Sequence, residues 1–188
     1  SQEAFTHHVS YFHGCYVNYN YPQLGKDLVK ILNAIGYGVH LLDDEHCCGV
    51  ALISNGLIDK ARRQGTKNIA SIRRSIEEED RTVLATSSTC AFTLRDEYPH
   101  LLGIPNTDVR DRIELASRFL YRLLEEKQIE LVFKPGYQKR VAYHTPCHME
   151  KLGWAIYSTS LLRMIPGVTL RMLPSNCCGI AGTYGFKR

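Results

Sequence analysis

The stretch Val9-Ser10-Tyr11-Phe12-His13-Gly14-Cys15 decides the fold, because a short apolar and aromatic run leads directly into a glycine and a cysteine. This pattern is typical of a β-strand that ends in a loop. A cysteine pair follows at Cys47-Cys48-Gly49, and the same order returns in His144-Thr145-Pro146-Cys147 and Cys177-Cys178-Gly179. The chain therefore contains two units, each with a lone cysteine followed by a Cys-Cys-Gly triplet.

The duplication extends beyond the cysteines. The two triplets are 130 positions apart, and at this offset apolar residues of the two units coincide: Ile31, Leu32 and Ile35 fall on Leu161, Leu162 and Ile165. Self-similarity at a fixed spacing indicates a repeated structural unit. We therefore expect a first domain over residues 1–133 and the N-terminal half of a second, truncated domain over residues 140–188.

The spacing of apolar residues predicts alternating strands and helices. In the first unit we expect strands at 9–12, 39–42 and 82–86, and helices at 24–35, 57–76 and 111–127. In the second unit we expect strands at 141–144 and 168–173 and a helix at 152–165. This order predicts an α/β fold made of duplicated strand–helix units with parallel sheets.

Each expected strand of the first unit is followed by a cysteine. Cys15, Cys47-Cys48 and Cys90 lie in the segments that leave the carboxyl ends of these strands. Such segments gather at one edge of a parallel sheet, where ligands bind. We therefore expect four thiols that are far apart in the sequence to converge. The hydroxyl residues at 87–89 are good candidates for a helix N-cap.

Composition narrows the kind of protein. The chain has 188 residues, 44% of them hydrophobic and 22% charged, with a formal net charge of +4. That balance is typical of a globular protein, and the charge is too mild to predict a nucleic-acid or anionic membrane partner. An odd count of seven cysteines, with no signal peptide, argues against a secreted disulfide scaffold. No apolar run approaches the ~18 residues of a membrane span.

Three kinds of chemistry compete for the cysteines. Buried structural thiols are common, but they do not explain two adjacent pairs at equivalent positions of a repeat. Structural zinc uses four thiolates, yet adjacent cysteines hold one tetrahedral ion awkwardly. A polynuclear iron–sulfur cluster accepts neighbouring thiolates on different iron atoms. The spacing therefore favours an iron–sulfur cluster, with zinc as the less favoured occupant.

The cysteine pattern resembles the cysteine-rich CCG domain of heterodisulfide reductase B subunits and related electron-transfer subunits. Longer stretches are similar to the C-subunit family of anaerobic glycerol-3-phosphate dehydrogenases, over essentially the whole chain. These are Phe12-His13-Gly14-Cys15-Tyr16-Val17-Asn18-Tyr19-Asn20, Ala85-Thr86-Ser87-Ser88-Thr89-Cys90, His144-Thr145-Pro146-Cys147-His148-Met149-Glu150-Lys151 and Cys177-Cys178-Gly179-Ile180-Ala181-Gly182-Thr183-Tyr184-Gly185-Phe186.

This resemblance implies an electron-transfer role in anaerobic respiration. Members of the family carry iron–sulfur clusters and work with flavin-containing dehydrogenase subunits A and B. They pass electrons from glycerol 3-phosphate toward the menaquinone pool and attach subunits A and B to the cytoplasmic membrane. Because no stretch of this sequence is long and apolar enough to span a bilayer, we expect a peripheral attachment on the cytoplasmic side of the bacterial inner membrane. The ferredoxin modules of the family, with their C-x-x-C-x-x-C runs, are absent from these residues, so we expect a piece of such a protein.

The resemblance also assigns cluster ligands. Cys15, Cys47, Cys48 and Cys90 are the expected ligands of the first site, where four thiolates suit a cubane [4Fe-4S] cluster. Ser87 stands where the general pattern has a further cysteine, so it is a candidate oxygen ligand and a five-cysteine cluster is disfavoured. Only Cys147, Cys177 and Cys178 remain for the second site, which we expect to bind a cluster weakly or not at all.

Nearby histidines are open to several interpretations. His13 and His144 each lie two or three positions before the first cysteine of a unit, where they could ligate metal, relay protons or form a loop hydrogen bond. His46 and His148 could tune a cluster through contacts with its ligands. The residues themselves identify none of these roles.

Two other functions remain as alternatives. One is a redox enzyme that acts directly on a thiol or disulfide substrate, as heterodisulfide reductases do. The other is a docking module with unmetallated thiols. The sequence has no phosphate loop, no G-x-G-x-x-G after a strand and no G-x-S-x-G elbow, which argues against nucleotide and hydrolase chemistry.

Overall fold

The structure is a computed structural model that describes residues 1–180, 183 and 185. Ala181, Gly182, Tyr184 and Phe186, which belong to the stretch from Cys177 to Phe186, lie outside the described residues. The contacts divide the chain into two compact units, one of Ser1–Leu115 with Gly179–Arg188 and one of Ala116–Cys178. The domain limits expected from the repeat, 1–133 and 140–188, follow the sequence duplication and stay a prediction.

The first unit is built on a four-stranded parallel sheet in the order β2-β1-β3-β4. Its strands are β1 (His7–Phe12), β2 (Tyr37–Leu41), β3 (Thr82–Ala85) and β4 (Ile113–Leu115). In the register, Val9 lies opposite Val39 on one side and Thr82 on the other. The four residues at the end of β1 are buried, as expected for a central strand with both faces covered.

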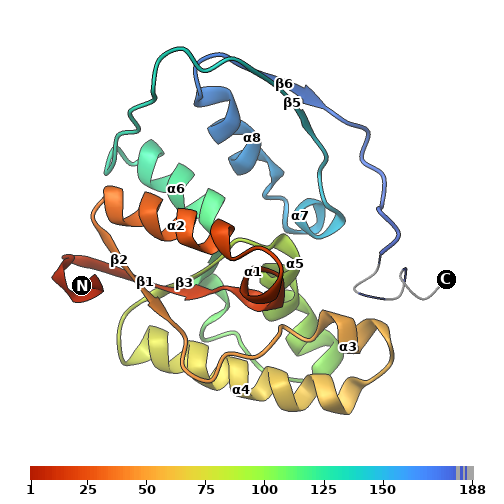
Figure 1. Cartoon of the computed structure of the whole chain (residues 1–188). Helices are drawn as coiled ribbons and strands as arrows, with labels where there is room; N and C mark the ends of the chain where they lie inside the picture. The colour runs from red at the N-terminus through yellow and green to blue at the C-terminus, as the bar shows by residue number, and fades with distance from the viewer. Residues whose placement is uncertain (181–182, 184, 186–188) are drawn as a thin grey trace. The chain divides into compact units, whose positions relative to one another are not determined.

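Helices cover both faces of this sheet. Figure 1 shows α2 (Pro22–Ala34) on one face and α4 (Ile58–Glu77) on the other. Both form because apolar residues recur on one side, and α2 has Pro22 in its first turn, where no amide hydrogen bond is lost. The shorter helices of the unit are η1 (Gln2–Ala4), α1 (Gly14–Tyr19), α3 (Val50–Ser54), α5 (Ser88–Phe92), the π-helix η2 (Thr93–Leu102) and η3 (Arg110–Arg112).

The core of the first unit lies between α4, η2 and the sheet. It contains Phe12, Ile72, Val83, Leu94 and Tyr98, together with the thiols of Cys48 and Cys90. Gly65 allows α4 and η2 to approach closely, because a Cβ there would lie 2.6 Å from Ile104 Cδ1 and 3.1 Å from the Tyr98 ring. Two of the thiols are therefore part of the hydrophobic core.

The second unit is smaller. Parallel strands β5 (Lys139–Tyr143) and β6 (Val168–Met172) pair with Val141 opposite Leu170. Its helices are α6 (Ala116–Glu125), α7 (Cys147–Leu152) and α8 (Ala155–Met164). Helix α6 packs against α8 and its N-cap residue Trp154: the Arg118 guanidinium lies 5.0 Å from the centre of the Trp154 ring, and the rings of Tyr121 and Tyr157 are 5.6 Å apart. The pairing of β5 with β6 repeats that of β1 with β2.

The structure confirms the predicted α/β fold with parallel sheets. Two expected helices were wrong in extent. The helix expected at 111–127 begins at Ala116, because Ile113 and Leu115 are fully buried in the edge strand β4 beside β3. The helix expected at 152–165 begins at Ala155, since Gly153 adopts a left-handed conformation (φ 69°) that ends α7.

Candidate functional site

Four thiols lie beyond the carboxyl ends of three adjacent parallel strands. Cys15 lies in the first turn of α1, after β1, and Cys47-Cys48 precede α3, after β2. Cys90 lies in α5, after β3. The order β2-β1-β3 therefore brings together residues that are up to 75 positions apart in the sequence. This arrangement is the convergence that the sequence predicted.

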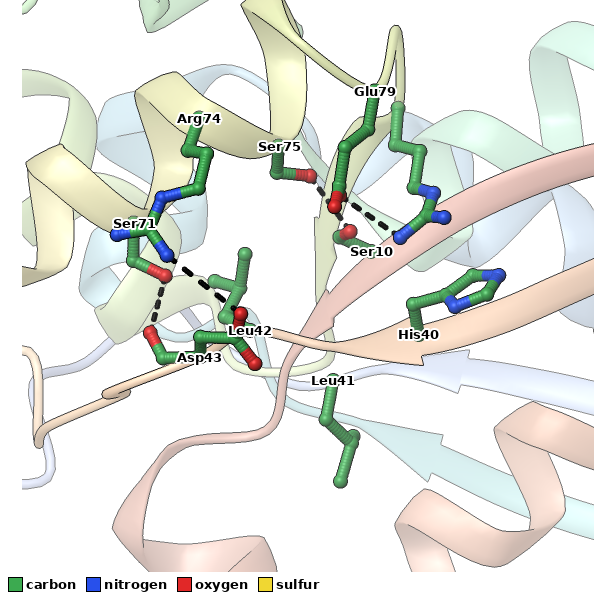
Figure 2. Close-up of a pocket in the computed structure, with 10 residues that line it drawn as sticks. Ser10, His40, Leu41, Leu42, Asp43, Ser71, Arg74, Ser75 and Glu79 are labelled. Atoms are coloured by element: carbon green, nitrogen blue, oxygen red, sulfur yellow. Dashed lines mark hydrogen bonds and ion pairs between the residues drawn. The ribbon is translucent and has the colours of Figure 1, made fainter.

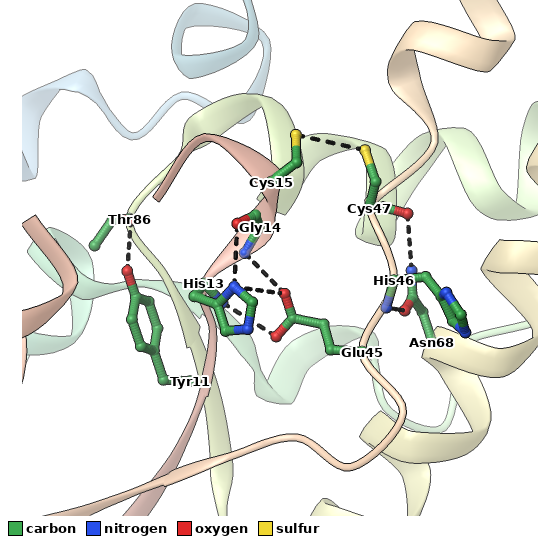
Figure 3. Close-up of polar contacts among 9 residues, drawn as sticks. All are labelled: Tyr11, His13, Gly14, Cys15, Glu45, His46, Cys47, Asn68 and Thr86. Carbon is green, nitrogen blue, oxygen red and sulfur yellow. Dashed lines mark hydrogen bonds and ion pairs between the residues drawn. The ribbon is translucent and has the colours of Figure 1, made fainter. Parts of the chain in front are cut away.

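The thiols contact one another in a chain. Cys15 Sγ lies 3.7 Å from Cys47 Sγ (Figure 3), Cys47 interacts with Cys48, and Cys48 interacts with Cys90. Cys15 is exposed and Cys47 half-buried, whereas Cys48 is only 2% exposed and Cys90 only 8%. The four thiols thus lead from the surface into the core of the first unit. We call them the thiol chain.

Burial and crowding disfavour the thiolate forms of Cys15, Cys47 and Cys48. Burial raises the pKa of Cys15, and the neighbouring Cys47 raises it further. The contact with Cys48 and burial raise the pKa of Cys47 far above its usual range. For Cys48, the contact with Cys47 lowers the pKa, but the contact with Cys90 and burial outweigh it and raise the pKa. Positive charge among the sulfur atoms would reverse these effects.

Two glycines shape the loops that carry the thiols. Gly14 has φ 70°, and a Cβ there would lie 3.2 Å from Cys90 Sγ. Gly49 has φ 92° and starts α3 directly after the cysteine pair. A left-handed residue at this point allows the chain to turn, and glycine adopts that conformation without strain. The glycine of the motif is therefore required by the turn.

A buried carboxylate links the first two cysteine loops, as Figure 3 shows. Glu45 Oε1 accepts a hydrogen bond from Gly14 N at 2.8 Å and Oε2 accepts one from His13 N at 3.2 Å. His13 Nδ1 lies 3.3 Å from Glu45 Oε1, and the carboxylate side chain is only 4% exposed. Burial raises the pKa of Glu45, while the Gly14 amide and His13 lower it. The imidazole of His13 thus contacts its own loop and Glu45.

A buried amide holds the other side of the cysteine pair. Asn68, in α4, is 1% exposed; its Oδ1 accepts from His46 N at 2.8 Å, and its Nδ2 donates to Cys47 O at 3.2 Å. The same Nδ2 lies 3.0 Å from the hydroxyl of Tyr98, which is fully buried. Burial raises the pKa of Tyr98, so its hydroxyl stays protonated. The backbone of residues 46–47 is therefore fixed from α4.

Glu45, Asn68 and Tyr98 were missed in the sequence. Glu45 is the third residue of the acidic run 43–45, whose other two members are exposed, so the run is typical of a surface loop. Asn68 did carry a signal, because it is polar on the apolar face of a helix, next to Ile69. Ser87 was predicted as a helix N-cap and as a candidate oxygen ligand. In the structure it is the N-cap of α5, where its Oγ accepts a hydrogen bond from Cys90 N at 3.3 Å.

In the second unit the three cysteines are exposed: Cys147, Cys177 and Cys178. Cys147 begins α7, after β5, and the pair follows β6. His144 Nε2 lies 2.6 Å from the backbone oxygen of Asn176, so this histidine also makes a loop contact. Within the part of the chain that the structure describes, no three His, Cys, Asp or Glu side chains are arranged to hold a single metal ion.

Two pockets differ in their chemistry. One, of about 250 Å³, opens beside Cys15 and Cys47 and is also lined by Gln64, whose buried Oε1 has no hydrogen-bond partner among the described residues. Another, of about 170 Å³, lies between α4 and β2 (Figure 2) and is lined by no cysteine. Its arginines are paired, Arg74 with Asp43 and Arg81 with Glu79.

These features define an α/β protein with a chain of four thiols at the carboxyl edge of a parallel sheet. The chain belongs to the family of the cysteine-rich domain CCG, which matches residues 9–95 and 141–188. The first match covers all four residues of the thiol chain, and the second covers the cysteines of the smaller unit.

Three curated relatives illustrate the family. The chain is 57% identical to the C subunit of anaerobic glycerol-3-phosphate dehydrogenase of Escherichia coli K12, over all of this chain and 47% of that protein. It is 30% identical to lactate utilization protein A of Shouchella clausii, over 95% of this chain and 74% of that protein. It is 28% identical to an uncharacterized iron-sulfur protein of Methanocaldococcus jannaschii, over 93% of this chain and 32% of that protein. The chain thus spans about half the length of the Escherichia coli protein.

Proposed function

We propose that the thiol chain binds an iron–sulfur cluster and that the protein serves in electron transfer within a dehydrogenase complex. The observation that carries the proposal is the convergence of Cys15, Cys47, Cys48 and Cys90 from three strand ends. Four sulfur donors in succession are the ligand type that iron–sulfur clusters use. A relative named as an iron-sulfur protein supports the same cofactor.

The residues fit such a cluster better than a single zinc ion. No three of the described potential ligands are arranged for one ion, and two of the thiols are adjacent in sequence. Crowding and burial raise the pKa values of Cys47 and Cys48, and bound iron would offset this effect by stabilising thiolates. The cluster would supply reversible one-electron transfer at a potential set by its ligands and surroundings.

The ligand number favours a [4Fe-4S] cluster with one thiolate for each iron. Ser87 caps α5 through Cys90 N, so in this proposal it acts on the ligand loop and the thiols supply the ligands. The second unit offers Cys147, Cys177 and Cys178 and would bind a cluster weakly or not at all.

The similarity to the C subunit of anaerobic glycerol-3-phosphate dehydrogenase supports the physiological role that we propose. In this proposal the flavin-containing subunits A and B deliver electrons to the cluster, which passes them toward the menaquinone pool. Attachment would be peripheral, on the cytoplasmic side of the bacterial inner membrane. None of the described helices is long and apolar enough to cross a membrane.

Anaerobic reconstitution tests the cofactor. We expect the protein to bind about four iron and four sulfide per molecule and to give a reduced-state EPR signal. Cys48→Ser should lose most of the iron, whereas the matched variant Cys147→Ser should keep the signal of the first site. Retention of an unchanged signal by Cys48→Ser, or zinc as the only bound metal, would contradict the proposal.

A second measurement tests the role. Addition of glycerol 3-phosphate and subunits A and B should reduce the reconstituted cluster, and omission of either of these two proteins should abolish the reduction. Direct turnover of a thiol or disulfide substrate without them would instead favour a heterodisulfide-reductase-like enzyme.

A further inference from the structure

The first helix after β1 has no cap of its own. Its N-cap residue, His13, makes no side-chain cap hydrogen bond to α1. The first amides of a helix have no partner within the helix, so they need one elsewhere. Glu45 supplies it, because its carboxylate accepts hydrogen bonds from both His13 N and Gly14 N, across 32 and 31 positions of sequence.

These contacts connect two cysteines through very short pieces of chain. Cys15 directly follows Gly14, and Cys47 lies two residues after Glu45. The two sulfur atoms lie 3.7 Å apart. Because Cys15 is exposed, packing against the core does not hold it in place as it holds Cys48. The two hydrogen bonds to Glu45 therefore connect the Cys15 loop directly to the Cys47 loop.

We propose that Glu45 is a positioning residue, which holds the Cys15 loop against the Cys47 loop so that the two thiols act as a pair toward one cofactor. Hydrogen bonds to an ionised carboxylate are roughly twice as strong as neutral ones, and both oxygens are used here. The inference rests on the proposed cluster for its functional meaning, but the pairing of the thiols is a property of the protein alone.

The second unit connects its cysteine loops through different contacts. Ser175 is the residue 130 positions after Glu45 and donates to Glu150 Oε2 at 3.0 Å. His144 reaches the Asn176 backbone oxygen at 2.6 Å. The carboxylate there comes from α7 and accepts from a hydroxyl, whereas Glu45 accepts from two backbone amides. The position of Glu45 thus holds a carboxylate in the unit with four thiols and a hydroxyl in the unit with three.

Glu45→Gln is the direct test, because it keeps the size of the side chain and replaces one accepting oxygen by an NH₂ group. Asp44→Asn is the matched control: it makes the same charge change in the neighbouring residue, which is exposed and contacts His46 and Lys67. Asn also tolerates the left-handed conformation of Asp44 (φ 54°).

The first readout uses protein without cofactor. Diamide accepts two hydrogen atoms as two thiols form a disulfide, and peptide mapping measures the Cys15–Cys47 product. Its rate depends on how well the two thiols are held together, so we expect roughly a tenfold decrease in Glu45→Gln and no change in Asp44→Asn. The second readout, on reconstituted protein, is the EPR line shape and the half-life of bound iron under a chelator, which should change only in Glu45→Gln.

The outcomes separate this inference from the proposed function. Wild-type rates of disulfide formation together with an unchanged cluster in Glu45→Gln would overturn the positioning role and leave the cluster standing. If the wild-type protein binds no cluster and Glu45→Gln still forms the disulfide more slowly than wild type, the proposed function is overturned and the positioning role is supported. If Glu45→Gln does not fold, Glu45→Asp carries the same test, since it keeps the charge and shortens the reach by one methylene.

Discussion

Cys15 Sγ and Cys47 Sγ lie 3.7 Å apart, although 32 positions separate the residues, and they form the exposed end of a thiol chain whose other end is buried. The pair spans the loops after two adjacent parallel strands, β1 and β2. Cys48 and Cys90 continue the chain into the core of the first unit. The site therefore has one face toward solvent and one face within the protein.

This gradient of exposure predicts the order of alkylation. Without cofactor, iodoacetamide should modify Cys15 well before Cys48, because Cys48 is 2% exposed and reacts only after local opening. An opening free energy of ~2 kcal/mol corresponds to a roughly 30-fold slower reaction. Isotope-coded labelling and peptide mapping measure both rates. Equal rates at the two cysteines would contradict the burial of Cys48.

Gly14→Ala should impair the site more than Gly36→Ala. Both glycines have positive φ, 70° and 88°, so both substitutions strain the backbone by about 1–2 kcal/mol. Only at Gly14 does the new Cβ meet a ligand candidate, at 3.2 Å from Cys90 Sγ, whereas nothing lies within 4 Å at Gly36. We expect a lower iron content in Gly14→Ala alone. Equal iron content in the two variants would contradict the crowding argument.

Asn68→Leu should destabilise the first unit by about 3 kcal/mol, because it leaves His46 N, Cys47 O and the Tyr98 hydroxyl without their buried partner. Urea denaturation measures the change. The neighbouring variant Lys67→Gln serves as control, since Lys67 is 56% exposed and should stay within about 0.5 kcal/mol of wild type. A similar small change in Asn68→Leu would show that other contacts hold the cysteine pair.

His40 should make stability depend on pH. Burial and, next, the positive charge of Arg81 lower the pKa of His40 from its ordinary value of 6.5. Between the folded-state pKa and 6.5, the unfolded chain therefore binds a proton that the folded protein does not. The contribution of neutral His40 to the free energy of unfolding is fully present above pH 6.5 and is lost as the pH falls through the folded-state pKa. The loss is at most about 1.4 kcal/mol per pH unit.

Denaturation of wild type and His40→Gln at several pH values between about 5 and 8 checks this dependence. The free energy of unfolding of the wild type should fall more steeply below pH 6.5 than that of the variant. His40 also contacts His8 at 3.0 Å and Glu3 at 3.6 Å, and both of these residues are kept in the variant. Parallel pH curves would contradict a lowered pKa for His40.

Local sequence predicted most of the secondary structure of the first unit and failed where a tertiary contact decides it. The helix α4 was evident because its apolar residues repeat over 20 residues. Strand β4 was not, because three residues carry too little periodicity and Ile113 is buried only through its pairing beside β3. The break at Gly153 was missed because a glycine within a helical pattern does not by itself end a helix.

The sequence by itself determined the duplication, the α/β fold with parallel strands, and the four cysteines that approach one another, since strand ends meet at one edge of a parallel sheet. Only the tertiary structure decided how these cysteines are held. Glu45 and Asn68 act through hydrogen bonds across 21 to 32 positions of sequence, and the sequence pattern does not say which groups these side chains contact. The donors and acceptors become partners only when the chain brings the cysteine loops and α4 to the same place.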